Sequence, residues 1–213
     1  MTDLSSPDVM DRPAGRAAVP RRFSKDDVHV WDGLVPKPLR ERIGALLQRP
    51  IWQYGWQSNN KLNRFCHWHA HFAGGGINSR RSCEEELEDK VELSPVRELW
   101  LLLSSGPLAG HEPLRVYANS HTYGIEGYVH TDNEDTENYF STIYYAHELW
   151  HRNWAGETVF YASGGDEIIS SVFPRPGRVV SFFGAIPHCA RAPSRDCAEL
   201  RMSLVVKTQL KAP

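Results

Sequence analysis

The chain has 213 residues, of which 41% are hydrophobic, and its 24 basic and 26 acidic side chains give a formal net charge of −2. This length suits one domain with a full hydrophobic core and is short for two. The balanced charge shows no basic stripe of the kind that nucleic acids select, so we expect no nucleic-acid partner.

The N-terminal part gives no sign of secretion or membrane insertion. Residues 1–22 are rich in Pro, Ser, Ala, Asp and Arg without periodicity, so we expect a disordered tail before a single domain over residues 23–213. No stretch has the apolar core of a signal peptide or the length of a membrane span, so no membrane contact is expected. The four cysteines lack CxxC spacing, which argues against a zinc ribbon. We therefore expect a cytoplasmic protein with reduced thiols.

Two amphipathic segments in the first half predict helices. Residues 36–50 place four apolar side chains on one helical face and end at Pro50. A second helix is predicted over residues 95–103, and the acidic run 83–90 is typical of a solvated helix face. The four apolar positions of the first helix are Leu39, Ile43, Leu46 and Leu47.

From residue 112 onward, short β-like runs alternate with turn residues. Examples are "LRVYANS", "GYVHTD", "STIYYAH", "ETVFYAS", "RVVSFFG" and "LRMSLVVKTQ". Many short strands after a helical part predict a mainly β, α+β fold: a double-stranded β-helix (a cupin-like jelly roll) with the N-terminal helices packed outside it.

A His-x-Asp pair carries the clearest chemical signal. In "GYVHTDN", the alternation of a strand would place His130 and Asp132 on one face, where both can reach one metal ion. His188 would arrive from another strand. Two histidines and one carboxylate form the facial triad that binds non-haem Fe(II) and leaves positions open for a co-substrate and dioxygen. Arg201 begins a later strand and could hold a co-substrate carboxylate through two parallel hydrogen bonds.

The order of motifs over residues 112–210 resembles the prolyl 4-hydroxylase-like branch of the Fe(II)/2-oxoglutarate-dependent dioxygenases. The motifs are "GYVHTDN", "STIYYAH", "WAGET", "PRPGRVVSFFGAIPH" and "RMSLVV". One departure is Ala155, where relatives often have a second glycine. The resemblance implies an enzyme that uses Fe(II), 2-oxoglutarate and O2, and that releases succinate and carbon dioxide as it hydroxylates an unactivated C–H bond. The carboxylate of Asp132, which halogenating relatives replace, favours hydroxylation, with desaturation or cyclisation left open.

The same resemblance suggests further contacts for 2-oxoglutarate. Arg201 would bind its far carboxylate, with Ser203 two residues on along the same strand face. Tyr117 and Asn119 alternate on another strand and could also face the co-substrate, or else belong to the core and a turn. Only one of two adjacent tyrosines can face the pocket, and Tyr144 is the expected one.

Two other arginines compete with Arg201. Arg191 and Arg195 also follow His188, but they belong to a loop rich in Pro, Ser and Asp, which positions a guanidinium less well than a strand does. We rank them second as carboxylate ligands, and Arg191 is a candidate for contact with the substrate.

The substrate is the least predictable part. His67, His69 and Trp154 are candidates for a pocket wall beside the iron, although Trp154 could equally fill the core. No carboxylate or cysteine at ligand spacing accompanies the histidines of "CHWHAHF", which argues against a second metal site. We expect a small-molecule or amino-acid-like substrate. The alternatives are a protein-directed prolyl or asparaginyl hydroxylase and a non-catalytic cupin-like metal-binding module. The oligomeric state is not indicated.

Overall fold

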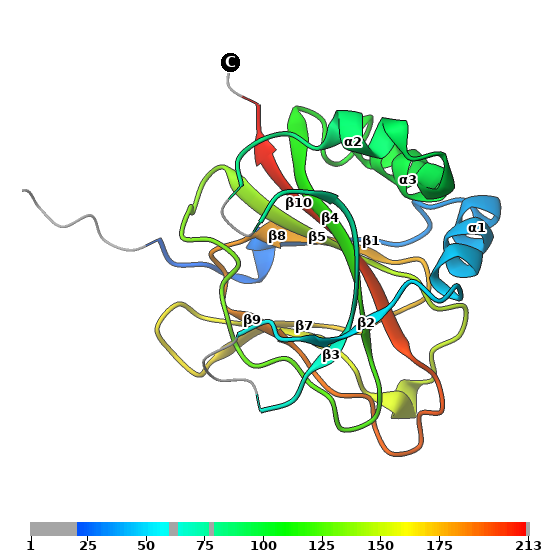
Figure 1. The fold of residues 1–213 in the computed structure, drawn as a ribbon. Helices are drawn as coiled ribbons and strands as arrows, with labels where there is room; N and C mark the ends of the chain where they lie inside the picture. Colours follow the sequence, from blue (N-terminus) through cyan, green and yellow to red (C-terminus); the bar gives the residue numbers. More distant parts are fainter. Residues whose placement is uncertain (1–20, 60–63, 77–78, 212–213) are drawn as a thin grey trace, which may run out of the picture.

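The computed structural model describes residues 21–59, 64–76 and 79–211, and these form a mainly β fold with helices on one side (Figure 1). Residues 1–20 of the predicted tail lie outside the described residues. Arg21 is already part of the domain, since its guanidinium donates a hydrogen bond to the Thr136 carbonyl at 2.8 Å.

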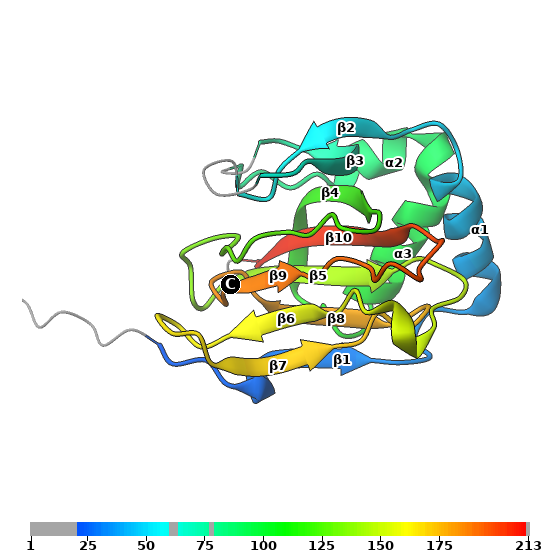
Figure 2. The ribbon, with the colours of Figure 1, turned by 90° about the horizontal axis from the view of Figure 1, so that it is seen from below.

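Two antiparallel sheets face each other, as the prediction of a jelly roll required (Figure 2). The larger has seven strands in the order β1 (Val28–Trp31), β8 (Val179–Phe183), β5 (Tyr139–Tyr145), β10 (Arg201–Leu210), β4 (His111–His121), β3 (His67–Gly74) and β2 (Gln53–Trp56). The smaller has three strands in the order β7 (Ile168–Val172), β6 (Thr158–Tyr161) and β9 (His188–Ala190).

Three α-helices cover the face of the larger sheet that points away from the smaller one (Figure 1). They are α1 (Lys37–Leu47), α2 (Glu84–Asp89) and α3 (Ser94–Ser104), accompanied by the short 3-10 segments η1 (Lys25–Asp27), η2 (Val91–Leu93) and η3 (Arg152–Trp154). All four apolar positions predicted for the first helix are buried in α1. Among the described residues, no helix combines the length and apolar character needed to cross a membrane.

The alternation of side chains along β10 separates two cores. Met202, Leu204 and Val206 belong to the core beneath the helices. Val205 belongs to a second core between the two sheets, together with Phe160 of the smaller sheet. One strand therefore contributes an apolar face to the outer layer and a different face to the space between the sheets.

The segment "GYVHTD" is not the regular strand that its sequence predicted. It makes a single antiparallel bridge between His130 and His188, in which each backbone N–H donates to the other carbonyl, at 3.1 and 2.9 Å. The N–H of Asp132 donates instead to the carbonyl of Gly184 at 2.8 Å. The physical reason is that β9 has only three residues, which leaves too little partner for a longer ladder.

Candidate active site

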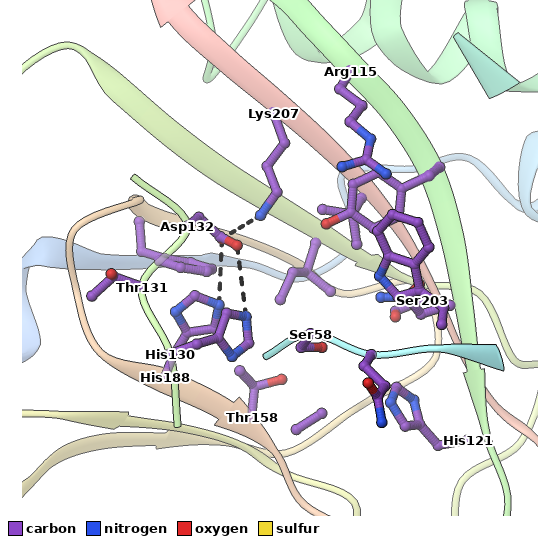
Figure 3. Close-up of a pocket in the computed structure, with 18 of the residues that line it drawn as sticks. Ser58, Arg115, His121, His130, Thr131, Asp132, Thr158, His188, Ser203 and Lys207 are labelled. Atoms are coloured by element: carbon purple, nitrogen blue, oxygen red, sulfur yellow. Dashed lines mark hydrogen bonds and ion pairs between the residues drawn. The ribbon is translucent and has the colours of Figure 1, made fainter. Parts of the chain in front are cut away.

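His130, Asp132 and His188 converge at one point in the pocket between the sheets (Figure 3). One donor atom from each lies within 4.8 Å of the others. Nε2 of His130 is 3.6 Å from Oδ1 of Asp132, and Nε2 of His188 is 3.4 Å from Oδ2. Within the described part of the chain, no other three His, Cys, Asp or Glu side chains are arranged in this way.

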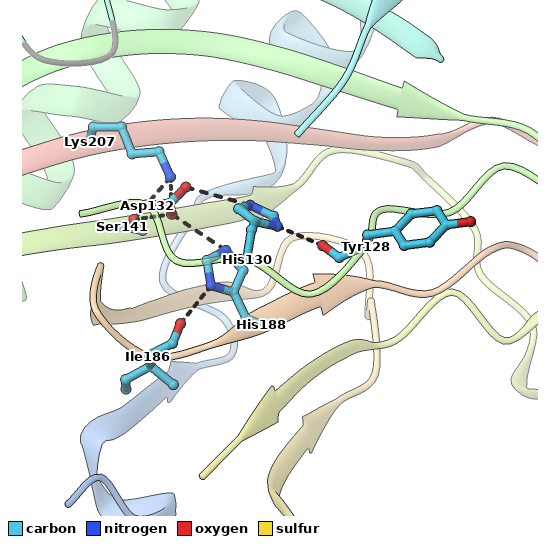
Figure 4. A network of polar contacts seen from close by, with 7 residues as sticks. All are labelled: Tyr128, His130, Asp132, Ser141, Ile186, His188 and Lys207. Atoms are coloured by element: carbon cyan, nitrogen blue, oxygen red, sulfur yellow. Dashed lines mark hydrogen bonds and ion pairs between the residues drawn. The ribbon is translucent and has the colours of Figure 1, made fainter. Parts of the chain in front are cut away.

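Backbone carbonyls orient both imidazoles. Nδ1 of His130 lies 2.8 Å from the Tyr128 carbonyl, and Nδ1 of His188 lies 2.8 Å from the Ile186 carbonyl (Figure 4). A carbonyl can only accept a hydrogen bond, so Nδ1 carries the proton in each ring. In the neutral ring this leaves the Nε2 lone pair for a metal ion, and both Nε2 atoms face Asp132.

The carboxylate of Asp132 is held from one side only. Its Oδ2 accepts hydrogen bonds from the hydroxyl of Ser141, at 2.6 Å, and from the ammonium of Lys207 (Figure 4). Its Oδ1 lies 3.6 Å from Nε2 of His130. Two donors thus orient one oxygen, while the other faces an imidazole of the triad.

The charge states suit a cation. Burial acts to raise the pKa of Asp132, but the positive charge of Lys207 and the two neighbouring imidazoles outweigh it and hold that pKa well below its ordinary value. Burial lowers the pKa of His188 to about 3. An ionised Asp132 beside a neutral His188 is the protonation state that metal ligands need.

Four residues predicted to contact the co-substrate line this pocket. Tyr117 and Asn119 project into it from β4, and Arg201 and Ser203 project into it from β10. The two strands are neighbours, and Ser203 is paired directly with Asn119. The predicted set therefore shares one cavity with the triad.

Arg201 is buried in the pocket wall, with 1% of its surface exposed. Its Nε donates to the Gly156 carbonyl at 2.5 Å, and its Nη2 donates to Oγ1 of Thr158 at 2.9 Å. The ring of Tyr145 lies beside the guanidinium, 5.4 Å from its Cζ, and the Tyr145 hydroxyl is 2.6 Å from Oγ1 of Thr158. These contacts fix the Nε and Nη2 edge of the guanidinium in the wall of the pocket that also holds the triad.

The structure corrects the choice between the two adjacent tyrosines. Tyr144 points into the core beneath the helices and lies outside the pocket lining. Tyr145, on the other face of β5, contacts Arg201 and Thr158. The reason is the register, because Tyr144 pairs with Leu204, which also faces the helices. We therefore replace Tyr144 with Tyr145, which lies behind the pocket lining and supports Arg201 and Thr158 of the wall.

The predicted histidine wall lies one layer behind the cavity. His67 and His69 are buried but do not line the pocket themselves. His69 stacks on Trp56 at 4.2 Å and places Nδ1 2.9 Å from Oδ1 of Asn119. His67 stacks on His121 at 4.5 Å, and Trp56, Asn119 and His121 face the cavity. The two histidines thus support residues of the wall.

The remaining candidates lie outside the pocket lining. Arg191 is exposed and forms an ion pair with Glu126 at 3.6 Å. Arg195 is also exposed, and its Nη2 lies 3.3 Å from the Tyr123 hydroxyl. Trp154 is half-buried and packs edge-on against another tryptophan of the same segment. Neither loop arginine is therefore placed to compete with Arg201.

Sequence reasoning missed several polar residues of this site, among them Arg115, Thr158 and Lys207. A signal existed for two of them, because Arg115 precedes Tyr117 by two residues on β4 and Lys207 follows Val205 by two on β10. Continuing the strand alternation from the predicted residues would have placed both on the pocket face.

No protein-family model matches the chain, and no curated protein matches it in sequence. Solved structures do match. An oxidoreductase of the 2OG-Fe(II) oxygenase family from Burkholderia pseudomallei superposes with a TM-score of 0.65 and 17% identity, covering 86% of this chain and 85% of that one. A prolyl-4-hydroxylase from Pseudomonas putida gives 0.58 and 19%, covering 87% and 93%.

A third similar structure is a prolyl hydroxylase from Trichoplax adhaerens in complex with a hypoxia inducible factor peptide. It has a TM-score of 0.61 and 13% identity, and the match covers 86% of this chain and 83% of that one. This chain therefore has the fold of the 2OG-Fe(II) oxygenases, the structural class that its motifs resemble.

Proposed function

We propose that the protein is an Fe(II)/2-oxoglutarate-dependent oxygenase that hydroxylates an unactivated C–H bond of a small molecule. The observation that carries this proposal is the convergence of His130, Asp132 and His188 in a pocket whose wall also holds the buried Arg201. A metal ligand set and a carboxylate-binding guanidinium in one cavity are the two parts that 2-oxoglutarate chemistry requires.

The donor set fits Fe(II). Nε2 of His130, Nε2 of His188 and Oδ1 of Asp132 would hold the ion, since the Nδ1 protons are engaged by carbonyls and Oδ2 is engaged by Ser141. When bound, Fe(II) supplies the activation of dioxygen that couples decarboxylation of 2-oxoglutarate to succinate with transfer of one oxygen atom to the substrate C–H bond.

The protein's own residues position the reactants. Arg201 would bind the far carboxylate of 2-oxoglutarate, and its contacts with Gly156 and Thr158 fix the plane of the guanidinium in advance. Phe182 packs edge-on against His188 at 4.6 Å, and Ile143 and Val205 add apolar surface to the lining. These side chains exclude water from one side of the metal site.

Two other functions remain as alternatives. A non-catalytic cupin-like module would have no need of the buried guanidinium of Arg201 beside the metal site. A prolyl hydroxylase acting on peptides is favoured by the likeness to the Pseudomonas putida and Trichoplax adhaerens structures. The charge of the pocket, described below, supports a small anionic substrate over a peptidyl proline.

A screen for substrate-stimulated succinate release tests the proposal. The purified protein with Fe(II) and 2-oxoglutarate would be offered small carboxylic acids, amino acids and a proline-rich peptide. We expect succinate formation to rise with a small molecule and to require Fe(II) and dioxygen. Stimulation by the peptide alone would establish the prolyl hydroxylase alternative, and no succinate under any condition would favour the cupin-like module.

A further inference from the structure

Two cationic side chains lie together in the pocket at a distance along the strand from Arg201. Arg115 on β4 and Lys207 on β10 are direct partners across the two strands, and both line the cavity from the same side (Figure 3). Arg201 begins β10, six positions before Lys207, which corresponds to roughly 20 Å of strand. One carboxylate cannot therefore serve both Arg201 and Arg115.

Arg115 is sandwiched between aromatic rings and has no anionic partner. Its Cζ lies 4.9 Å from the ring centre of Trp56 and 4.8 Å from that of Tyr117. Its Nε is buried without a hydrogen-bond partner, and the guanidinium forms no ion pair with any described residue. A guanidinium that lines a cavity without an anionic partner is suited to bind an anionic ligand.

The charge balance of the pocket points to an anion. Its lining contains three cations, Arg115, Lys207 and Arg201, and a single carboxylate, that of Asp132. Binding of Fe(II) and of the dianion 2-oxoglutarate adds no net charge. Two positive charges then remain in a partly desolvated cavity, where an unpaired charge is unfavourable.

We propose that Arg115, supported by Lys207, binds a carboxylate of the primary substrate, so that the substrate is a small organic acid. This inference rests on the proposed oxygenase function. Lys207 contacts Asp132, so a carboxylate held by Arg115 lies within a small molecule's length of the metal ligands. Trp56 and Tyr117 would cover the carbon skeleton next to that carboxylate, which favours a planar or apolar body.

The test compares acids with their uncharged amides. The protein would be loaded with Mn(II), which does not support turnover, and saturated with 2-oxoglutarate so that Arg201 is occupied. A panel of small monocarboxylates, including phenylacetate, and the matching amides, including phenylacetamide, would be titrated by calorimetry. We expect at least one acid to bind the wild type about tenfold or more tightly than its amide, as a charge-assisted contact provides.

Variants locate the contact. Arg115→Gln should remove the preference for the acid, Arg115→Lys should keep part of it, and Arg49→Gln, which changes an exposed arginine outside the pocket, should behave as wild type. Thermal unfolding of each variant checks its fold, and the lysine variant keeps the test valid if the glutamine variant does not fold. No preference for any acid in the wild type, or a preference that persists in Arg115→Gln, would overturn the inference.

The binding of 2-oxoglutarate, measured first on the same samples, separates the two proposals. If the Mn(II) protein does not bind 2-oxoglutarate, the oxygenase function fails whatever Arg115 does. If 2-oxoglutarate binds normally and the acid preference fails, only the substrate inference is lost. If Arg115→Gln abolishes 2-oxoglutarate binding instead, Arg115 serves the co-substrate and the substrate inference is again overturned.

Discussion

The two faces of β10 differ in the polarity of their side chains and in their surroundings. On the helix side, Leu204 and Val206 pack in an apolar core. On the opposite side, Arg201, Ser203 and Lys207 face a polar pocket that also contains the metal ligands. Because successive side chains of a strand alternate, a single ten-residue segment contributes to stability with one set of positions and to chemistry with the other.

The face of β10 beneath the helices (the outer face) buries apolar side chains, whereas the face toward the pocket (the inner face) buries charged ones. Burial of Leu204 stabilises the fold through the hydrophobic effect, by about 2 kcal/mol for a fully buried leucine. Burial of Arg201 desolvates a charge, and hydrogen bonds from its guanidinium offset that cost only in part. Changes on the outer face should therefore alter unfolding, whereas changes on the inner face should alter ligand binding.

Removing the metal-binding carboxylate should have the largest effect on the inner face. Asp132→Ala takes away the only anionic ligand of the triad, so we expect iron content and succinate formation to fall to background. Metal analysis of the dialysed protein measures the first quantity directly. Asp166→Ala, which removes an exposed carboxylate, is the control and should retain iron. Full iron occupancy in Asp132→Ala would show that the triad is assigned wrongly.

On the outer face, Leu204→Ala should reduce the free energy of unfolding by about 2–5 kcal/mol, through lost apolar burial and the cavity left behind. The dissociation constant of 2-oxoglutarate should stay within about twofold, since the side chain points away from the pocket. Urea unfolding and calorimetric titration provide the two numbers. A large loss of co-substrate affinity in a folded Leu204→Ala protein would contradict the separation of the faces.

Arg201→Gln should weaken 2-oxoglutarate binding by about 10- to 100-fold, which corresponds to the loss of a charge-assisted hydrogen bond of about 1.5–3 kcal/mol. Titration of the Mn(II) protein with 2-oxoglutarate measures this change. Arg191→Gln is the matched control, because Arg191 lies outside the pocket lining and should leave the affinity unchanged. An unchanged affinity in Arg201→Gln together with a weakened affinity in Arg191→Gln would show that Arg191 binds the carboxylate.

The smallest expected effect is the pH dependence of the free energy of unfolding that comes from His67, which lies behind the pocket wall. Burial, together with the nearby His69, lowers the pKa of His67 to about 4, below its ordinary value of 6.5. The unfolded chain therefore takes up this proton first as the pH falls, so the stability from neutral His67 is complete above pH 6.5 and is lost toward pH 4.

Between pH 7.5 and pH 5.5, His67 should account for a loss on the order of 1 kcal/mol in the free energy of unfolding. Urea unfolding of the wild type and of His67→Gln at both pH values isolates this share, since the variant should lose less stability over the interval. Equal losses in the two proteins would mean that His67 is not held neutral by the fold.

The sequence predicted the parts of this molecule that depend on local pattern. The helical face of α1 follows from the spacing of its four apolar residues, and the triad follows from one His-x-Asp pair and a later histidine. The choice between Tyr144 and Tyr145 could not be made, because alternation shows that the two face opposite ways without showing which face is inside. That information lies in the pairing of β5 with β10.

Long-range pairing also explains the other residues that were missed or misplaced. Alternation along β10 predicts the face on which Lys207 lies, but its contact with Asp132 depends on the position of β10 in the middle of the larger sheet. His67 and His69 were predicted to form a wall, but the pairing of β3 with β4 places them behind Asn119 and His121. Position in a sheet depends on partners far away in the sequence.

The most direct test of the account is the visible spectrum of the anaerobic Fe(II) protein during titration with 2-oxoglutarate. If the inner face of the larger sheet holds both the metal and the co-substrate, a weak charge-transfer band should grow to saturation at one equivalent per site. The band should be absent in Asp132→Ala and should require higher concentrations in Arg201→Gln. A fully metallated wild-type protein whose spectrum does not respond to 2-oxoglutarate would contradict the account.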